Sequence, residues 1–259
     1  MKRMILGSGW KMFLSDSEAL AHAEAIAAYG TEAQGLELFV LPSFTALHRV
    51  TERLAGSGIR VGAQNMAWAE KGAFTGEVSV LSLKEMGVTH VEIGHTERRE
   101  LFGETVATIA LKLRTALQHG LTPVYCFGEN AAEKRNGQTE RVLAEEFREA
   151  LHGIGFEEAQ TIIFAYEPVW AIGVAQSAEP EEVNPIIGSL RSVLAELYPS
   201  SKEGSEFRIV YGGSVNLDNF PKLLEQPHID GLFVGRASLV PENYAEMVRQ
   251  MTRKAAEQR

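Results

Sequence analysis

Short hydrophobic runs rich in β-branched residues alternate along the chain with longer segments in which hydrophobic residues recur every three to four positions. The short runs predict eight strands, at residues 4–9, 36–42, 59–65, 88–94, 121–127, 161–167, 207–213 and 229–235. The longer segments predict helices, the clearest of which span 17–30, 104–120 and 139–155. The last two end at a glycine, a common stop signal for helices. The chain therefore repeats a strand–helix unit from end to end.

Strands that alternate with helices form parallel sheets. Eight such units within 259 residues predict an α/β protein with a single closed (β/α)8 barrel of eight parallel strands. An open, doubly wound sheet is the alternative. Because no proline-rich linker or low-complexity tract divides the chain, we expect residues 1–259 to form one domain.

Composition narrows the class of protein and its partners. The chain is 45% hydrophobic and 23% charged, as in ordinary soluble globular proteins, and its net charge of -9 argues against nucleic acid as a partner. No stretch approaches the roughly 20 apolar residues of a membrane span, so we expect no membrane partner. A single cysteine, Cys126, and the lack of a signal-peptide pattern at the start indicate a cytoplasmic location.

Candidate catalytic residues follow three of the predicted strands, where the active sites of such barrels lie. Lys11 follows the first strand in GWKM, although alone it could be a surface lysine beside a buried tryptophan. The fourth strand ends in EIGHTERRE, which contains His95, suited to acid/base chemistry near neutral pH, and Glu97, a residue typical of a helix start. The sixth ends at Glu167, which Pro168 keeps extended. Hydrophobic neighbours would strengthen Glu167 as a base, whereas a rim salt bridge is the alternative.

Glycines follow the last two strands, in YGGSV (211–215) and VGRAS (234–238). Glycine lets backbone N–H groups approach an anion, and phosphate sites recur at these two loops of such barrels. We therefore expect a small phosphorylated ligand held by Gly173, Ser214 and Gly235. Residues 171–182 read as a mobile loop able to close over that ligand, before a helix that starts near Pro180. With a carboxylate base and a histidine at the other end of the ligand, the pattern suits proton abstraction beside a carbonyl, giving an enediolate.

Metal and cofactor motifs are lacking in the sequence. The seven histidines do not show metal-ligand spacing, and no second cysteine exists to help. No GxGxxG sequence opens a predicted helix, so a nicotinamide cofactor is not supported. We therefore expect no metal and no cofactor.

Seven motifs resemble the triosephosphate isomerase family, in the family's order and over essentially the whole chain. They are GWKM (9–12), VGAQNMAW (61–68), GAFTGE (72–77), EIGHTERR (92–99), AYEPVWAIG (165–173), YGGSV (211–215) and DGLFVG (230–235). The resemblance implies a TIM barrel and an isomerase of short phosphorylated sugars. Triosephosphate isomerase is itself the standard example of a glutamate base paired with a neutral histidine under a closing loop.

The resemblance also assigns roles to individual residues. It implies Glu167 as the base, His95 as the electrophile that polarises the carbonyl oxygen, and Lys11 as the positive charge beside the enediolate. Glu97 matches a position close to that lysine and histidine. Main-chain N–H groups of four residues would bind phosphate: Gly173, Gly213, Ser214 and Gly235.

A homodimer is implied as well. Asn65, Thr75 and the loop between them resemble the family's dimer contact, in which this loop inserts near the partner's active site.

Four departures from the family pattern concern the site. Gly9 replaces a usual asparagine that contacts substrate, which removes a polar group and is expected to open space. Phe13 replaces another asparagine, and Val-Ala-Gln-Ser at 174–177 replaces the lid's Thr-Gly-Lys-Thr. Arg236 replaces a second glycine beside the phosphate; its N–H can still donate, but its side chain must point away or add charge.

These departures, with VGAQNMAWAEKG (61–72) and PHIDGLFVGR (227–236), resemble the family branch that isomerises four-carbon phosphoketoses. We therefore expect conversion of L-erythrulose 1-phosphate to D-erythrulose 4-phosphate. Interconversion of D-glyceraldehyde 3-phosphate and dihydroxyacetone phosphate is the alternative. A non-catalytic phosphosugar-binding barrel and an aldolase with a Schiff base on Lys11 are further alternatives.

Overall fold

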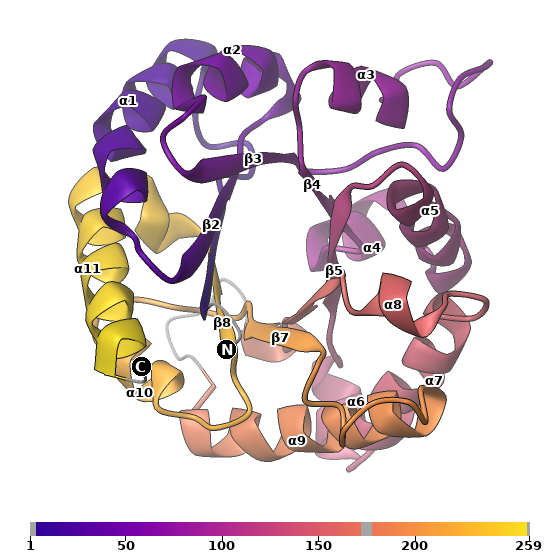
Figure 1. Ribbon diagram of the computed structural model, residues 1–259. Coiled ribbons are helices and arrows are strands. Elements are labelled where there is room, and N and C mark those ends of the chain that lie inside the picture. The colour runs from indigo at the N-terminus through magenta and orange to yellow at the C-terminus, as the bar shows by residue number, and fades with distance from the viewer. Residues whose placement is uncertain (1–3, 172–177, 258–259) are drawn as a thin grey trace.

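The computed structural model describes residues 4–171 and 178–257, in which eight parallel strands close into a barrel in chain order (Figure 1). The strands are β1 (Met4–Gly9), β2 (Leu36–Leu41), β3 (Ile59–Ala63), β4 (His90–Ile93), β5 (Thr122–Phe127), β6 (Ile163–Tyr166), β7 (Arg208–Tyr211) and β8 (Gly231–Val234). Because β1 pairs with β8, the sheet has no free edge. The predicted (β/α)8 TIM barrel is confirmed, and the open doubly wound sheet is wrong.

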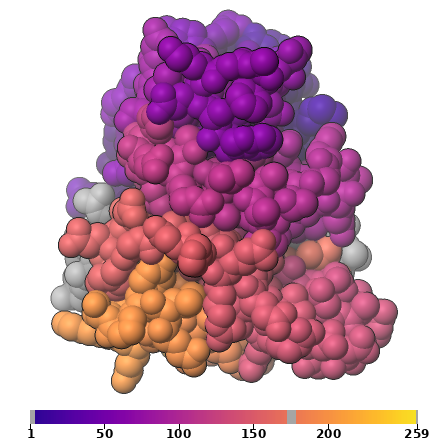
Figure 2. Space-filling view, turned by 90° about the vertical axis from the view of Figure 1, so that its right-hand side faces the viewer, coloured from indigo at the N-terminus to yellow at the C-terminus, as the bar shows by residue number. Residues whose placement is uncertain are grey.

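Helices form a ring outside the strands (Figure 1). They are α1 (Asp16–Glu32), α2 (Phe44–Leu54), α3 (Val80–Glu85), α4 (Thr96–Phe102), α5 (Val106–Gln118), α6 (Ala131–Arg135), α7 (Thr139–Ala150), α8 (Phe156–Ala159), α9 (Pro180–Leu197), α10 (Phe220–Leu224) and α11 (Pro241–Glu257), with 3₁₀ turns η1 (Val169–Ala171) and η2 (Arg236–Leu239). In the space-filling view, segments that follow one another in sequence lie as adjoining bands (Figure 2). Within the described ranges, no helix combines the length and apolarity that a membrane crossing needs.

Glycines were predicted to end two of the helices, and one of the two does so in the structure. Gly120 has a positive φ of 69° and follows the end of α5, as predicted. The helix expected to run to residue 155 stops at Ala150, and Gly153 turns the chain with a φ of 78°. Gly155 then starts α8 as its N-cap instead of ending α7. Gly155 therefore lies at a helix boundary, as predicted, but the helix begins after it instead of ending there.

Two hydrophobic layers surround the strands because successive side chains point to opposite faces. One layer fills the barrel and consists of Ile5, Phe39, Leu41, Val124, Cys126, Ile163, Ala165, Val210 and Phe233. The other packs the outside of the barrel against the helices. The barrel is therefore a packed core, and its polar inward-facing groups lie toward its two ends.

Candidate active site

Lys11 lies just after β1 in a strained backbone conformation, with a φ of 48° that non-glycine residues seldom adopt. Gln64 stabilises this turn, because its Nε2 donates to the carbonyl oxygens of Lys11 at 2.8 Å and Leu41 at 2.9 Å. The Lys11 Nζ contacts Glu97 Oε1 at 2.6 Å. Gln64 was not predicted as a site residue, and its side chain joins the loop after β3 to the end of β1.

His95 is the N-cap of α4, and its Nδ1 accepts a hydrogen bond from the Glu97 N–H at 3.1 Å. A nitrogen that accepts carries no hydrogen, so this bond assigns the imidazole proton to Nε2. Nε2 lies 3.9 Å from Glu167 Oε1. The start of α4 therefore holds the histidine as an N–H donor that faces the candidate base.

Glu167 follows β6 and is only 1% exposed. Its N–H donates to the Phe127 carbonyl at 2.7 Å, which continues the pairing of β5 and β6 and fixes the backbone of this residue. After the neighbouring strand β7, a Cβ at Gly212 would lie 2.9 Å from Glu167 Cγ. The first glycine after β7 thus leaves room for the Glu167 side chain. Its N–H donates to the Tyr166 carbonyl at 2.8 Å and is therefore not free to bind a phosphate.

Aromatic side chains flank the segment around Glu167, as predicted, but they also carry hydrogen bonds. Buried Glu129 accepts from Trp170 Nε1 at 2.8 Å and from the Tyr166 hydroxyl at 3.0 Å. The Lys134 ammonium lies 3.2 Å from the centre of the Trp170 ring. These contacts anchor the chain directly after the base.

The predicted phosphate loops are brought together, except for one residue. Gly173 and the rest of the predicted lid, 172–177, lie outside the described residues. Gly213 has no space for a side chain, because a Cβ there would lie 2.2 Å from the Tyr211 hydroxyl. Ser214 follows it, and Gly235 is the N-cap of η2, the short 3₁₀ helix after β8.

Gly235 also lies beside the lysine. A Cβ on it would come 3.9 Å from Lys11 Cε. The lysine therefore runs from the expected phosphate site toward Glu97.

The space expected beside Gly9 is filled. A Cβ at Gly9 would lie 3.1 Å from Cζ of Phe233, an inward-facing side chain of β8. This is tighter than ordinary van der Waals contact, so the phenylalanine occupies the volume in which a side chain at position 9 would start. The contact concerns the start of a side chain at position 9, so the expectation that Gly9 opens room for a longer substrate stays a prediction.

Arg236 points its side chain toward another departure from the family pattern. Its guanidinium carbon lies 5.9 Å from the centre of the Phe13 ring, within the range of a cation–π contact. Whether the side chain also adds charge to the phosphate site stays a prediction.

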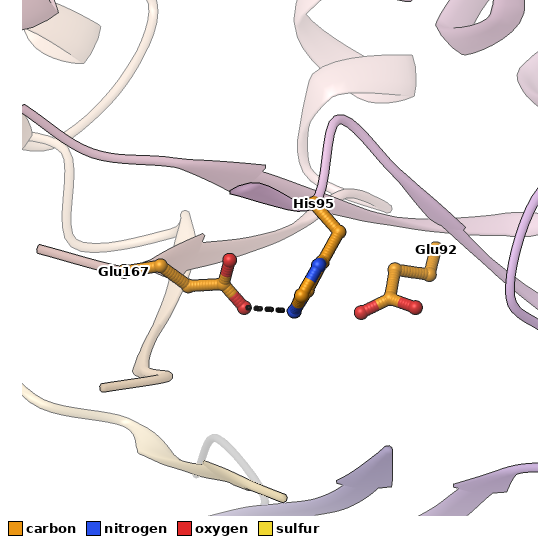
Figure 3. Close-up of side chains that lie close together, drawn as sticks. All are labelled: Glu92, His95 and Glu167. Atoms are coloured by element: carbon orange, nitrogen blue, oxygen red, sulfur yellow. Dashed lines mark ion pairs between the residues drawn. The ribbon is translucent and has the colours of Figure 1, made fainter. Parts of the chain in front are cut away.

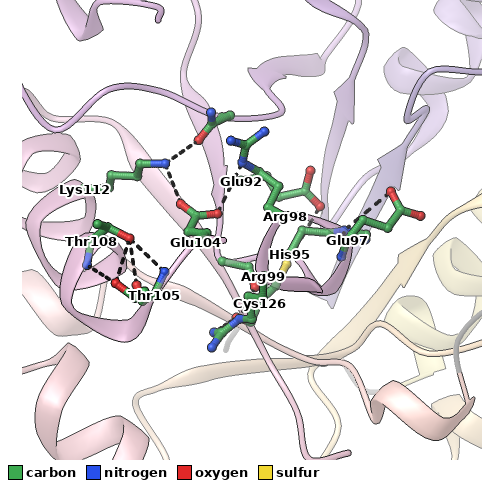
Figure 4. A network of polar contacts seen from close by, with 12 residues as sticks. Glu92, His95, Glu97, Arg98, Arg99, Glu104, Thr105, Thr108, Lys112 and Cys126 are labelled. Carbon is green, nitrogen blue, oxygen red and sulfur yellow. Dashed lines mark hydrogen bonds and ion pairs between the residues drawn. The ribbon is translucent and has the colours of Figure 1, made fainter. Parts of the chain in front are cut away.

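The two predicted dimer residues differ in exposure. Asn65 is buried, and its Oδ1 accepts from Lys112, which also pairs with buried Glu104 (Figure 4). Glu104 contacts Arg98 Nε at 3.3 Å in turn. Asn65 therefore supports the base of its loop from within the chain, whereas Thr75 lies exposed in the loop. The predicted dimer contact through Asn65 and Thr75 stays a prediction.

One buried carboxylate escaped prediction. Glu92, on β4, lies next to His95, and the two carboxyl groups of Glu92 and Glu167 lie on opposite sides of the imidazole (Figure 3). One ligand atom from each of these three residues lies within 4.8 Å of the others. Burial raises the pKa of Glu92 to about 7, with the nearby Glu167 charge acting in the same direction and His95 and Lys11 opposing it.

The two carboxylates also act on the histidine. Burial lowers the pKa of His95, but the charges of Glu167 and Glu92 outweigh it and raise this pKa above its usual value. The N–H of Glu97 acts in the opposite direction, because an imidazolium has no lone pair to accept it. A protonated Glu92 removes one of the two negative charges, so a neutral histidine and a protonated Glu92 favour each other.

The three residues are also of the kinds that bind divalent cations. The separation of 3.9 Å between His95 Nε2 and Glu167 Oε1 exceeds the roughly 3.4 Å between ligands of a tetrahedral zinc site. Their spacing here does not match such a centre, and the absence of a metal stays a prediction.

A parallel barrel whose C-terminal mouth gathers a lysine, a histidine and a glutamate near glycine-rich loops is typical of enzymes that move protons on phosphorylated sugars. The family model of triosephosphate isomerase matches residues 4–251. A triosephosphate isomerase of Thermoanaerobacter pseudethanolicus is 42% identical over 248 residues, which cover 96% of this chain and 99% of that protein. An L-erythrulose-1-phosphate isomerase of Brucella abortus is 42% identical over 261 residues, covering 98% of each. This chain belongs to the triosephosphate isomerase family and is an aldose–ketose isomerase.

Proposed function

We propose that this enzyme interconverts D-glyceraldehyde 3-phosphate and dihydroxyacetone phosphate through an enediolate. The observation that carries the proposal is the buried Glu167 carboxylate, 3.9 Å from the Nε2 of His95 and near Lys11. Most of the similar curated relatives carry the triosephosphate isomerase name. Phe233 supports the shorter substrate, because it fills the space expected beside Gly9.

Each residue has a chemical role in this proposal. Glu167 removes the proton from the carbon next to the carbonyl, and the electron pair of that bond moves to the carbonyl oxygen. The Nε2–H of His95 and the Lys11 ammonium stabilise the negative oxygen. A proton then moves from the hydroxyl of the deprotonated carbon to the negative oxygen. Glu167 returns its proton to the former carbonyl carbon, so that the C=O bond now lies on the carbon that was deprotonated. Glu97 orients the Lys11 ammonium group, because its Oε1 lies 2.6 Å from the Lys11 Nζ.

Phosphate binding is assigned to the far side of the mouth. We propose that N–H groups of Gly213, Ser214 and Gly235 contact the phosphate together with Gly173. Because Arg236 turns toward Phe13, its N–H can contribute without its side chain entering the site.

A second substrate, L-erythrulose 1-phosphate, is favoured by one observation. The Brucella abortus relative that is named for this substrate is as similar to the chain as the triosephosphate isomerases are. The same base and electrophile would serve that reaction. It requires room for one additional hydroxymethyl group, and the nearness of Phe233 to position 9 favours the shorter substrate.

Steady-state kinetics on both substrates test the proposal. Measured side by side with the same enzyme preparation, kcat/KM for D-glyceraldehyde 3-phosphate should exceed that for L-erythrulose 1-phosphate by at least tenfold. A preference for the four-carbon substrate would overturn the triose assignment and establish the second candidate. Borohydride with substrate should trap no adduct on Lys11, whereas a trapped adduct would indicate an aldolase.

We propose further that the enzyme is a cytoplasmic homodimer. Exposed apolar side chains lie after the first four strands, on loops, at the start of α2 and at the end of α4: Met12, Phe13, Phe44, Trp68, Phe74, Leu101 and Phe102. An apolar surface of this kind, beside the exposed Thr75, suits a second copy of the chain. Sedimentation should give twice the chain mass, and Thr75→Arg should shift it toward the monomer; a monomeric wild type would contradict the proposal.

A further inference from the structure

Glu92 is placed at the floor of the active site by the alternation of β4. His90, two residues earlier, faces the barrel interior, where its ring stacks on Phe39 with centroids 4.8 Å apart. Glu92 has the same parity and therefore faces inward as well, one layer closer to the C-terminal mouth. One of its carboxyl oxygens lies within 4.8 Å of ligand atoms of His95 and Glu167.

The Glu92 carboxyl has no strong partner in the described parts of the chain. The hydrogen bond that it accepts comes from the Cys126 thiol, with Sγ 3.8 Å from Oε1, and thiols are weak donors. No lysine, arginine or histidine lies within ion-pairing distance of it in residues 4–171 and 178–257. A buried carboxyl with only a weak donor is costly, and a stronger partner that arrives with the ligand would offset this cost.

Burial and the surrounding charges together set the protonation of Glu92. Glu167 and Glu97 contribute negative charge and Lys11 and His95 positive charge, while burial disfavours the ionised form most strongly. A carboxyl whose pKa lies near 7 carries a proton in much of the enzyme at neutral pH. In that form it donates a hydrogen bond, which an ionised carboxylate cannot do.

We propose that Glu92 is a further catalytic residue, whose protonated carboxyl donates a hydrogen bond to the substrate oxygen that becomes negative when Glu167 removes the neighbouring proton. No covalent bond changes at Glu92, and the electron pair from the broken C–H bond ends on that oxygen. The location fits, because Glu92 and Glu167 flank His95 within 4.8 Å (Figure 3). Gly9 brings no polar side chain to the site, so Glu92 supplies one from the floor.

The pH dependence of kcat/KM tests this role, since it reports ionisations of the free enzyme. The proton on Glu92 is present below its pKa and lost above it, so wild-type kcat/KM should fall as pH rises through about 7. Glu92→Gln keeps an N–H donor that does not ionise in this range. This variant should retain kcat/KM at pH 6 within about threefold and lose the fall near pH 7.

Glu92→Leu removes the donor and should lower kcat by about 10- to 100-fold, the usual size of a lost hydrogen bond to a charged group, with little change in KM. Its melting temperature should stay the same or rise, because a buried unpaired carboxyl is replaced by an apolar group. Ile93→Val is the matched control, since its side chain lies in the outer layer of the same strand. It should leave the pH profile unchanged.

The inference rests on the proposed isomerase function, and the two can fail separately. Absence of turnover in the wild type on both sugar phosphates would overturn the proposed function. An active wild type whose pH profile persists in Glu92→Gln, or whose kcat persists in Glu92→Leu, would overturn the role of Glu92. If Glu92→Leu does not fold, the Glu92→Gln profile alone decides.

Discussion

Both ends of the barrel hold a glutamate beside a histidine, yet the two glutamates differ in what surrounds them. At the N-terminal end, Glu37 of β2 lies 3.2 Å from His90 Nε2 and 3.1 Å from Arg208 Nη1. At the C-terminal end, Glu92 has the Cys126 thiol as its hydrogen-bond donor within the described residues. β4 contributes to both groups, through His90 and Glu92.

The pKa values of the two carboxyls separate accordingly. Burial raises the pKa of Glu37, but the hydrogen bond from His90 and the charge of Arg208 outweigh it and lower this pKa to about 2. Glu92 lacks such donors, and burial raises its pKa to about 7. Burial raises the pKa of both glutamates, so the difference between them lies in their partners. Glu37 is paired at the N-terminal end, which contributes to stability, whereas Glu92 lacks an ion-pair partner among the described residues at the C-terminal end, where the candidate active site lies.

Glu167→Gln should produce the largest effect and confine it to the C-terminal end. Removing the base should lower kcat by roughly 10³- to 10⁴-fold, because the amide cannot accept the carbon-bound proton. KM for the sugar phosphate and the melting temperature should change little, as measured by steady-state kinetics and thermal unfolding. Near-normal turnover in this variant would remove Glu167 from its assigned role.

Glu37→Gln should produce the converse result at the N-terminal end. Removing the carboxylate leaves Arg208 without its buried partner, which typically costs about 3–5 kcal/mol of unfolding free energy. Urea unfolding measures this loss, and kcat should remain within about twofold.

The matched control for Glu37→Gln is Glu24→Gln. Glu24 pairs with Arg53 at 2.7 Å, but its side chain is 68% exposed. A change below about 1 kcal/mol is expected there. Equal losses of unfolding free energy in Glu37→Gln and Glu24→Gln would contradict the view that the pair inside the barrel stabilises the protein more than the exposed pair.

Acid should weaken the N-terminal end by a smaller amount. The folded-state pKa of Glu37 is about 2, below its usual value of 4.5, so its stabilisation is fully present above pH 4.5 and is lost as pH falls toward 2. The difference in unfolding free energy between wild type and Glu37→Gln should shrink over this range, by on the order of 2 kcal/mol. Urea titrations at several pH values would measure it; a constant difference would show that Glu37 titrates normally.

The barrel and three of its reactive groups could be predicted from the sequence because they depend on local order. Alternation of strands and helices sets the fold class, and a residue just past a strand must lie at the C-terminal mouth. Lys11, His95 and Glu167 meet that condition, and the structure brings them together. Their roles were implied by family resemblance, which periodicity alone does not supply.

Contacts between distant strands could not be predicted in the same way. The filling of the space beside Gly9 depends on Phe233, which reaches it only because β8 closes the barrel against β1. Glu92 offered a signal, a carboxylate within the buried strand of VTHVEIG, but strand alternation does not show which parity faces the barrel interior. Gln64 acts on Lys11 through its backbone carbonyl, a contact that no motif records.

The contact between Gly9 and Phe233 also bears on how this mouth can evolve. A larger residue at position 9 would press against the phenylalanine ring, whereas a smaller residue at 233 would leave a void in the packed interior. Each single change is therefore unfavourable while the other position is unaltered. The effects of substitutions at the two positions should therefore be non-additive. The order in which they arise would decide whether an intermediate enzyme remains folded and active.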